Sequence, residues 1–108
     1  DHATLQLRTM YDRAAHPGIR VGAGTIVPYN TATADHNVRM DLINTWIRAQ
    51  VHADPAVAFV DTRAAVAAPG NPDRLAESPD GLHPSSHGYR LMAEVVAPVL
   101  ERVLRGIL

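Results

Sequence analysis

The chain has 108 residues, of which 46% are apolar and 19% are charged, as expected for one soluble globular domain. Ten basic and eleven acidic residues leave a net charge of −1, which excludes the basic surface of a nucleic-acid-binding protein or a polybasic membrane-surface module. All ten basic residues are arginine and cysteine is absent, which excludes a catalytic lysine, a thiolate nucleophile, disulfides and zinc fingers.

The first predicted element is a helix over residues 3–15, where apolar side chains recur every three or four residues. Pro17 ends this helix. A strand is predicted next over residues 19–28, which are rich in β-branched side chains. Gly22 and Gly24 inside the strand indicate that a neighbouring segment approaches its backbone closely.

A second helix is predicted to begin at a capping residue, Asp35 or Asn37, and to run to about residue 51. Trp46 lies at helical spacing among the apolar residues of this helix, so we expect it in the core rather than in a binding platform. A short apolar strand, Val57–Val60, follows.

Residues 61–84 show no sustained period and predict a long loop, with one helical turn near residues 63–67. A last helix is predicted over residues 86–107, where an apolar stripe recurs at helical spacing. Strands separated by helices predict an α/β fold with parallel strands and right-handed crossovers. Both strands are apolar throughout, so we expect both of their faces to be covered. Two strands leave unsatisfied sheet edges, so the pattern requires more strands than these residues supply.

The pattern that carries chemistry is an aspartate three residues before a histidine, Asp80 and His83, in a loop that leads into the last helix. An imidazole can accept and return a proton near neutral pH, and a carboxylate on its other nitrogen selects the tautomer and stabilises the imidazolium. The pair is therefore a candidate general base with its orienting group. On the spacing alone, a loop aspartate beside a solvated histidine is the simpler interpretation, because two-residue motifs recur by accident.

The surrounding residues resemble the SGNH (GDSL-like) hydrolases. Residues 80–84 read D-G-L-H-P and residues 87–93 read H-G-Y-R-L-M-A, similar to the family's last conserved block and its closing helix. Other segments resemble, in order, the family's fourth strand, the following helix, the fifth strand and its downstream loop: residues 24–28, 38–48, 57–61 and 71–75. The resemblance implies a three-layer α/β/α fold with a parallel, flavodoxin-like sheet.

The family's nucleophile block G-D-S and its oxyanion blocks do not occur in this sequence. The serines present are Ser78, Ser85 and Ser86, and we expect Ser85 or Ser86 to cap the last helix rather than to act as a nucleophile. We therefore interpret residues 1–108 as the C-terminal half of a single SGNH domain. The chain has no initiator methionine, and the missing strands and serine are expected upstream or on another chain.

The resemblance implies a serine esterase or lipase that hydrolyses an acyl ester, such as a carbohydrate acetyl ester or a lipid ester. Asp80 and His83 would be its catalytic pair, with no cofactor and no metal. The partners expected are a small-molecule ester and the upstream half of the domain, with no nucleic acid and no membrane span. Without a nucleophile, these residues alone are expected to be inactive.

Several alternatives remain open at this stage. The same fold could serve as a non-catalytic remnant or scaffold, and Asp80, His83 and His87 could form a two-histidine, one-carboxylate metal site. Asp35 with His36, and Asp61, could line a cleft near the ends of the strands, although a helix cap and a turn explain them more simply. Residues 22–24 read G-A-G, which lacks the third glycine of a dinucleotide-binding motif.

Overall fold

A computed structural model describes residues 2–106. Within these residues the elements are, in chain order, α1 (His2–Ala15), β1 (Val21–Gly24), α2 (Ala34–Ala53), β2 (Val57–Val60), α3 (Thr62–Val66), β3 (Ala67–Ala68), β4 (Asn71–Leu75) and α4 (Ser86–Leu104). The three long predicted helices and the strand at residues 57–60 are confirmed. Ile107, which the sequence assigns to the last helix, lies outside the described residues.

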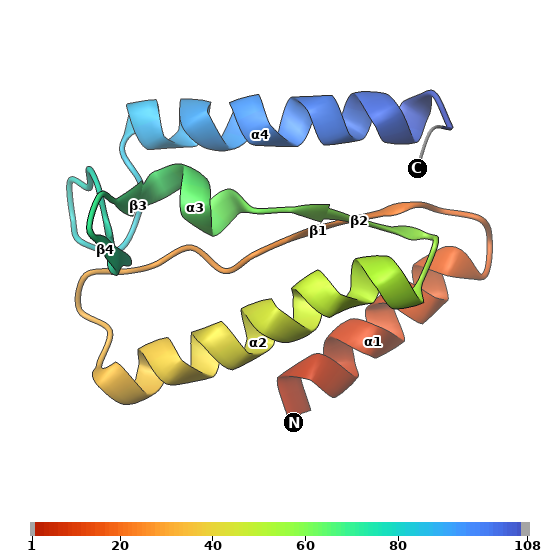
Figure 1. The fold of residues 1–108 in the computed structure, drawn as a ribbon, viewed down its shortest axis with the longest axis horizontal. Helices are drawn as coiled ribbons and strands as arrows, with labels where there is room; N and C mark the ends of the chain where they lie inside the picture. The colour runs from red at the N-terminus through yellow and green to blue at the C-terminus, as the bar shows by residue number, and fades with distance from the viewer. Residues whose placement is uncertain (1, 107–108) are drawn as a thin grey trace.

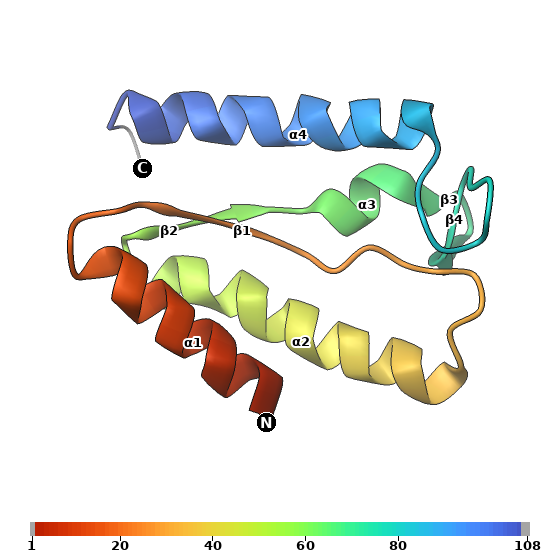
Figure 2. The same ribbon diagram turned by 180° about the vertical axis from the view of Figure 1, so that it is seen from behind.

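The two strands predicted to be parallel do pair in parallel, in a register that runs from Val21 opposite Val57 to Gly24 opposite Val60. Figures 1 and 2 show α4 on one side of this pair and α1 and α2 on the other. Helices therefore cover both sides, as the apolar strands require. The parallel sheet has only two short strands within residues 2–106, so these residues do not confirm the larger three-layer sheet.

The core lies between the sheet and the pair α1 and α2. It contains Tyr11, Ala23, Ile47 and Val57, all at least nine-tenths buried. Trp46 packs against this cluster and stacks on the Tyr11 ring, with ring centroids 5.9 Å apart. The expectation that Trp46 belongs to the core is thus confirmed, and the packing joins α1 and α2 to the sheet.

Polar contacts attach α1 to the end of α2. Arg8 Nη2 lies 2.5 Å from Asp54 Oδ2, and Arg8 Nη1 donates to Gln50 Oε1 at 2.9 Å. The backbone N–H of Ala56, followed by the Arg8 guanidinium, lowers the pKa of the Asp54 carboxyl.

The first strand is shorter than predicted, because residues 19–20 and 25–28 are not part of it. Beyond Gly24 the chain stays extended, but a side chain replaces a neighbouring strand. Asn44 Oδ1 accepts a hydrogen bond from Ile26 N at 2.7 Å, and Asn44 Nδ2 donates to Ile26 O at 3.2 Å. These long-range contacts cannot be deduced from β-branched content alone.

The cap of α2 is Thr33, so the prediction of Asp35 or Asn37 is wrong. Thr33 Oγ1 accepts from the backbone N–H of His36 at 3.1 Å. In return, the Thr33 backbone N–H donates to the His36 side chain, which completes a capping box. Asp35 instead pairs with Arg39 one turn further along the exposed face. A threonine accepts this bond as aspartate would, so the helix begins two or four residues earlier than predicted.

The loop predicted over residues 61–84 contains more structure than expected. The predicted turn is α3, and the antiparallel pair β3 and β4 follows it, with Ala67 opposite Leu75. Gly70 makes the turn between them with a φ of +79°. This hairpin was not predicted, because its five-residue strand begins Asn71-Pro72 and lacks alternating apolar residues. No helix in residues 2–106 has the length and apolar character needed to cross a membrane.

Candidate functional site

The loop before α4 brings Asp80 and His83 together. Asp80 Oδ2 lies 2.7 Å from His83 Nδ1. The other carboxylate oxygen, Oδ1, accepts hydrogen bonds from the backbone N–H groups of Leu82 at 2.9 Å and His83 at 2.8 Å. Gly81 permits this tight turn with a φ of +79°. The D-x-x-H spacing therefore folds into a turn that holds one carboxylate by four contacts, the fourth being from Ser78 Oγ to Asp80 Oδ1 at 3.4 Å.

These contacts favour the ionised form of the Asp80 carboxyl. The hydrogen bond from the His83 side chain, then the backbone N–H groups of His83 and Leu82, hold the pKa of the Asp80 carboxyl well below its usual range. An ionised acceptor favours the proton on Nδ1 of a neutral imidazole, which leaves Nε2 with a free lone pair. Within residues 2–106, no group is hydrogen-bonded to Nε2. Both side chains are at least half exposed, so the nitrogen is open to an incoming group.

Two residues that the sequence analysis did not identify support this loop. Ser78 Oγ accepts from Gly81 N at 2.8 Å and donates to His83 O at 2.6 Å. Asn30 donates its backbone N–H to Gly81 O at 2.7 Å, and its side-chain oxygen accepts from Leu75 N at 2.9 Å. Figures 1 and 2 show the loop after β1, which carries Asn30, running beside β4. Asn30 has no local motif that could have revealed its role.

Two of the three serines make structural hydrogen bonds. Ser85 caps α4, because its Oγ accepts from Gly88 N at 3.1 Å and donates to Glu77 Oε2 at 2.9 Å. This confirms the expectation of a capping serine. Ser78 supports the loop, and Ser86 begins α4. None of these three hydroxyls bonds to the His83 imidazole in the part of the chain that the structure describes.

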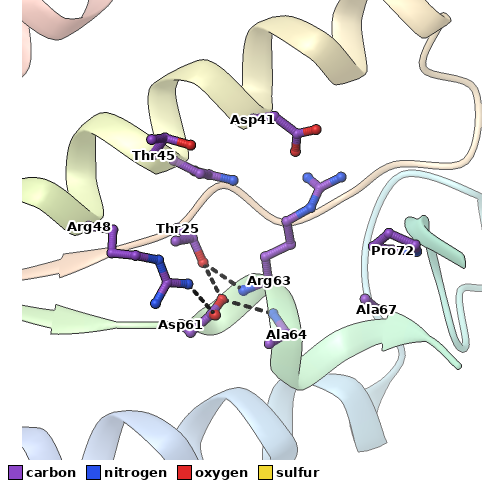
Figure 3. A pocket seen from close by; sticks show the side chains of 10 residues that line it. Thr25, Asp41, Thr45, Arg48, Asp61, Arg63, Ala64, Ala67 and Pro72 are labelled. Carbon is purple, nitrogen blue, oxygen red and sulfur yellow. Dashed lines mark hydrogen bonds and ion pairs between the residues drawn. The ribbon is translucent and has the colours of Figure 1, made fainter. Parts of the chain in front are cut away.

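A separate pocket of about 440 Å³ lies where β1 and β2 end (Figure 3). Asp61 caps α3 through Ala64 N at 3.0 Å, as the turn interpretation expected, but it also accepts from Thr25 Oγ1 and Arg48 Nη2, both at 3.0 Å. Burial acts to raise the pKa of Asp61, but these hydrogen bonds outweigh it and the net effect is a lower pKa. Asp80 and His83 do not line this pocket, and neither do Asp35 and His36.

Arg63, which the sequence analysis also missed, forms the buried wall of the same pocket. Its guanidinium donates to Ile26 O at 3.1 Å and to Asp73 Oδ1 at 3.0 Å, and its side chain is 9% exposed. It thereby ties α3 to the segment after β1 and to β4. No sequence pattern distinguishes this buried arginine from the exposed ones.

The alternative metal site is not supported. Among residues 2–106, no three histidine, cysteine, aspartate or glutamate side chains are grouped to hold a metal ion. His87, four residues after His83, lines a different cavity of about 120 Å³ with Glu77 and Leu91. The structure therefore groups Asp80 with His83 and leaves His87 apart.

Comparisons with known proteins identify a matching family and similar solved structures. The profile of the GDSL-like lipase/acylhydrolase family matches residues 1–91. A search of curated proteins gives no match. A Bacteroides fragilis NCTC 9343 protein assigned as an acylhydrolase has a crystal structure similar to this one, with a TM-score of 0.77 and 22% sequence identity. A GDSL-like lipase from Bacteroides thetaiotaomicron has a TM-score of 0.76 and 20% identity.

The coverage of these two structures is unequal. The first alignment covers 91% of this chain and 50% of the other, and the second covers 90% and 50%. The chain thus spans about half the length of the solved structures that it resembles. At this level of identity the structures show a shared fold. Because the family profile covers most of the sequence, residues 1–91, the chain belongs to the GDSL-like lipase/acylhydrolase family.

Proposed function

We propose that Asp80 and His83 are the orienting carboxylate and the general base of a serine ester hydrolase of the SGNH type. The observation that carries this proposal is the 2.7 Å contact between Asp80 Oδ2 and His83 Nδ1, with the second carboxylate oxygen held by two backbone amides. Membership of a family of ester hydrolases supports it. An orienting carboxylate of this kind selects the tautomer in which Nε2 can accept a proton.

The reaction would proceed in two proton-balanced steps. His83 Nε2 takes the hydroxyl proton of a serine as the serine oxygen attacks the ester carbonyl, and then gives that proton to the departing alcohol. In the second step Nε2 takes a proton from water as the water oxygen attacks the acyl-serine, and returns it to the serine oxygen when the acid leaves. Asp80 remains ionised and stabilises the imidazolium in both steps. Each oxyanion donor would contribute about 3–4 kcal/mol.

The serine and the oxyanion donors would come from the other half of the domain, upstream of residue 1. We propose that residues 1–108 are the C-terminal half of one three-layer α/β/α domain whose parallel sheet continues beyond β1. The half-length coverage of the solved structures supports this. The substrate would be a small acyl ester, such as a carbohydrate acetyl ester or a lipid ester. By themselves residues 1–108 hold a base without a nucleophile and would not catalyse hydrolysis.

The test compares the complete gene product with residues 1–108, using p-nitrophenyl acetate. We expect hydrolysis by the complete product and only background hydrolysis by the 108 residues. We also expect a glycine–aspartate–serine block upstream, and replacing its serine by alanine should abolish the activity. A gene without such a block, or a complete product without esterase activity, would refute the proposal in favour of a non-catalytic module of the same fold.

A further inference from the structure

The turn that carries Asp80 and His83 is joined to the rest of the described fold by a single hydrogen bond. The other hydrogen bonds of residues 77–84 either stay inside this segment or join it to the residue that follows. The exception is the bond that Asn30 N donates to Gly81 O at 2.7 Å. Internal contacts therefore give the turn its shape, whereas Asn30 helps to fix where the turn lies.

Asn30 holds this loop at two places. Its side-chain Oδ1 accepts from Leu75 N at 2.9 Å, and Leu75 is the buried last residue of β4, directly before the loop begins. Its backbone N–H holds Gly81, at the tip of the loop. A Cβ atom on Gly81 would lie 3.7 Å from Asn30 Cβ, so the two residues are also packed against each other. One residue thus joins the start of the loop to its tip.

Asn30 is itself held firmly in the segment after β1. Pro28, two residues earlier, is fully buried, and the Tyr29 hydroxyl lies 2.9 Å from His36 Nδ1 on α2. Ala32 N donates to Tyr29 O at 3.2 Å, which closes a turn around Asn30. This segment leaves the C-terminal end of β1, the end at which ligands bind in parallel α/β sheets. Asn30 is therefore a fixed point between that end of the sheet and the loop.

We propose that Asn30 is a positioning residue for the proposed ester hydrolysis, holding the Asp80–His83 turn where His83 Nε2 meets the nucleophile. This inference rests on the proposed function, because it adds a residue to the same site. Proton transfer needs a contact of about 2.6–3.2 Å between the base and the hydroxyl. A displacement of about 1 Å can cost roughly 100-fold in rate, even when its cause lies away from the reacting atoms.

The first test is the kcat and KM of the complete gene product for p-nitrophenyl acetate, at about pH 8, where an ordinary imidazole is neutral. Asn30→Ala removes the acceptor of Leu75 N and should lower kcat by about 10- to 100-fold, with KM changed by less than about 3-fold. Asn30→Asp keeps an oxygen acceptor in the same place. Because Asn30 Nδ2 makes no hydrogen bond within residues 2–106, this variant should retain kcat to within about 3-fold.

Asn71→Ala is the matched control. Asn71 lies at the other end of β4, and its Oδ1 accepts from the backbone N–H of Asp73 at 3.1 Å. The substitution removes the same kind of contact as Asn30→Ala does, but Asn71 makes no hydrogen bond to residues 77–84. We therefore expect Asn71→Ala to leave kcat unchanged.

A second readout separates the position of the turn from its shape. The contact between Asp80 and His83 is internal to the turn, so Asn30→Ala should leave the midpoint of the acid limb of kcat/KM against pH unchanged. The backbone amide of His83 should exchange with solvent at its original rate, whereas the amide of Leu75 should exchange roughly 5-fold faster or more. A shifted midpoint together with faster His83 exchange would show a collapsed turn and would overturn the proposal.

The remaining outcomes separate this inference from the proposed function. If His83→Ala abolishes hydrolysis but Asn30→Ala behaves like Asn71→Ala, the proposed function stands and Asn30 is not a positioning residue. A loss in Asn30→Asp as large as in Asn30→Ala would also overturn the inference alone. A kcat that His83→Ala leaves unchanged would refute the proposed function and this inference with it. Should Asn30→Ala not fold, Asn30→Ser, whose side chain is one atom shorter than that of asparagine, replaces it with the same expectations.

Discussion

Replacing Ser78 with alanine should loosen the loop that holds Asp80 against His83. The Ser78 hydroxyl makes two short hydrogen bonds in this loop, from Gly81 N at 2.8 Å and to His83 O at 2.6 Å, and a longer one to Asp80 Oδ1 at 3.4 Å. Each neutral hydrogen bond contributes about 0.5–1.5 kcal/mol, and water replaces part of that at a half-exposed site. We therefore expect local opening of the loop to become easier by about 1–2 kcal/mol, which is roughly a 5- to 30-fold change in the opening equilibrium.

The reporter is the backbone amide of His83, which donates to Asp80 Oδ1 at 2.8 Å and exchanges with solvent only when the loop opens. In Ser78→Ala its exchange should accelerate by roughly 5- to 30-fold. Ser86→Ala is the matched control, because the Ser86 side chain is exposed and makes no hydrogen bond within residues 2–106. An unchanged His83 exchange rate in Ser78→Ala, or an equal acceleration in both variants, would refute this account of the loop.

Three further predictions concern the scaffold. Ile47→Ala should lower the free energy of unfolding by about 2–5 kcal/mol, because Ile47 is 3% exposed in the core, and a loss below about 1 kcal/mol on chemical denaturation would contradict that packing. Thr33→Ala should cost about 1 kcal/mol through the lost cap of α2, whereas Asp35→Ala should be close to neutral, so equal losses would reject Thr33 as the cap. The backbone N–H of Ala56, followed by a guanidinium from α1, lowers the pKa of Asp54, so its stabilising contribution is present above the unfolded-state pKa near 4 and is lost as the pH falls below it. Asp54→Asn should therefore flatten the decline of Tm below about pH 4, and an unchanged slope would contradict the pairing.

Those parts of the fold that depend on local pattern could be predicted from the sequence. The strand Val57–Val60 is a compact apolar run that follows the helix-breaking Asp54-Pro55 and ends before Asp61, and the predicted bounds are the observed ones. A cap at Ser85 or Ser86 was predicted because small hydroxyl residues precede the apolar stripe of the last helix, and Ser85 is the cap. The first strand was predicted too long, because its end depends on Asn44, which is 18 residues away from Ile26 in the sequence.

In the candidate site, too, the local contact could be predicted from the sequence and the long-range contacts could not. Asp80 and His83 meet within a four-residue turn, so their spacing permits the contact, and the resemblance of the surrounding residues to the family's last block favoured it. The supporting contacts are not local. Asn30 reaches Leu75 across 45 positions, and Arg63 reaches Ile26 across 37. Such contacts depend on how the elements pack, and neither residue stands in a motif that would have revealed it.

The central claim is that His83 is the general base of an ester hydrolase, and the most direct test is the kcat for p-nitrophenyl acetate hydrolysis by the complete gene product. We expect His83→Ala to lower kcat by several orders of magnitude, because the nucleophile would lose the group that takes its proton. His87→Ala, a histidine substitution four residues further along on α4, should leave kcat close to that of the unsubstituted protein. A kcat that His83→Ala leaves unchanged, or lowers no more than His87→Ala does, would contradict the account.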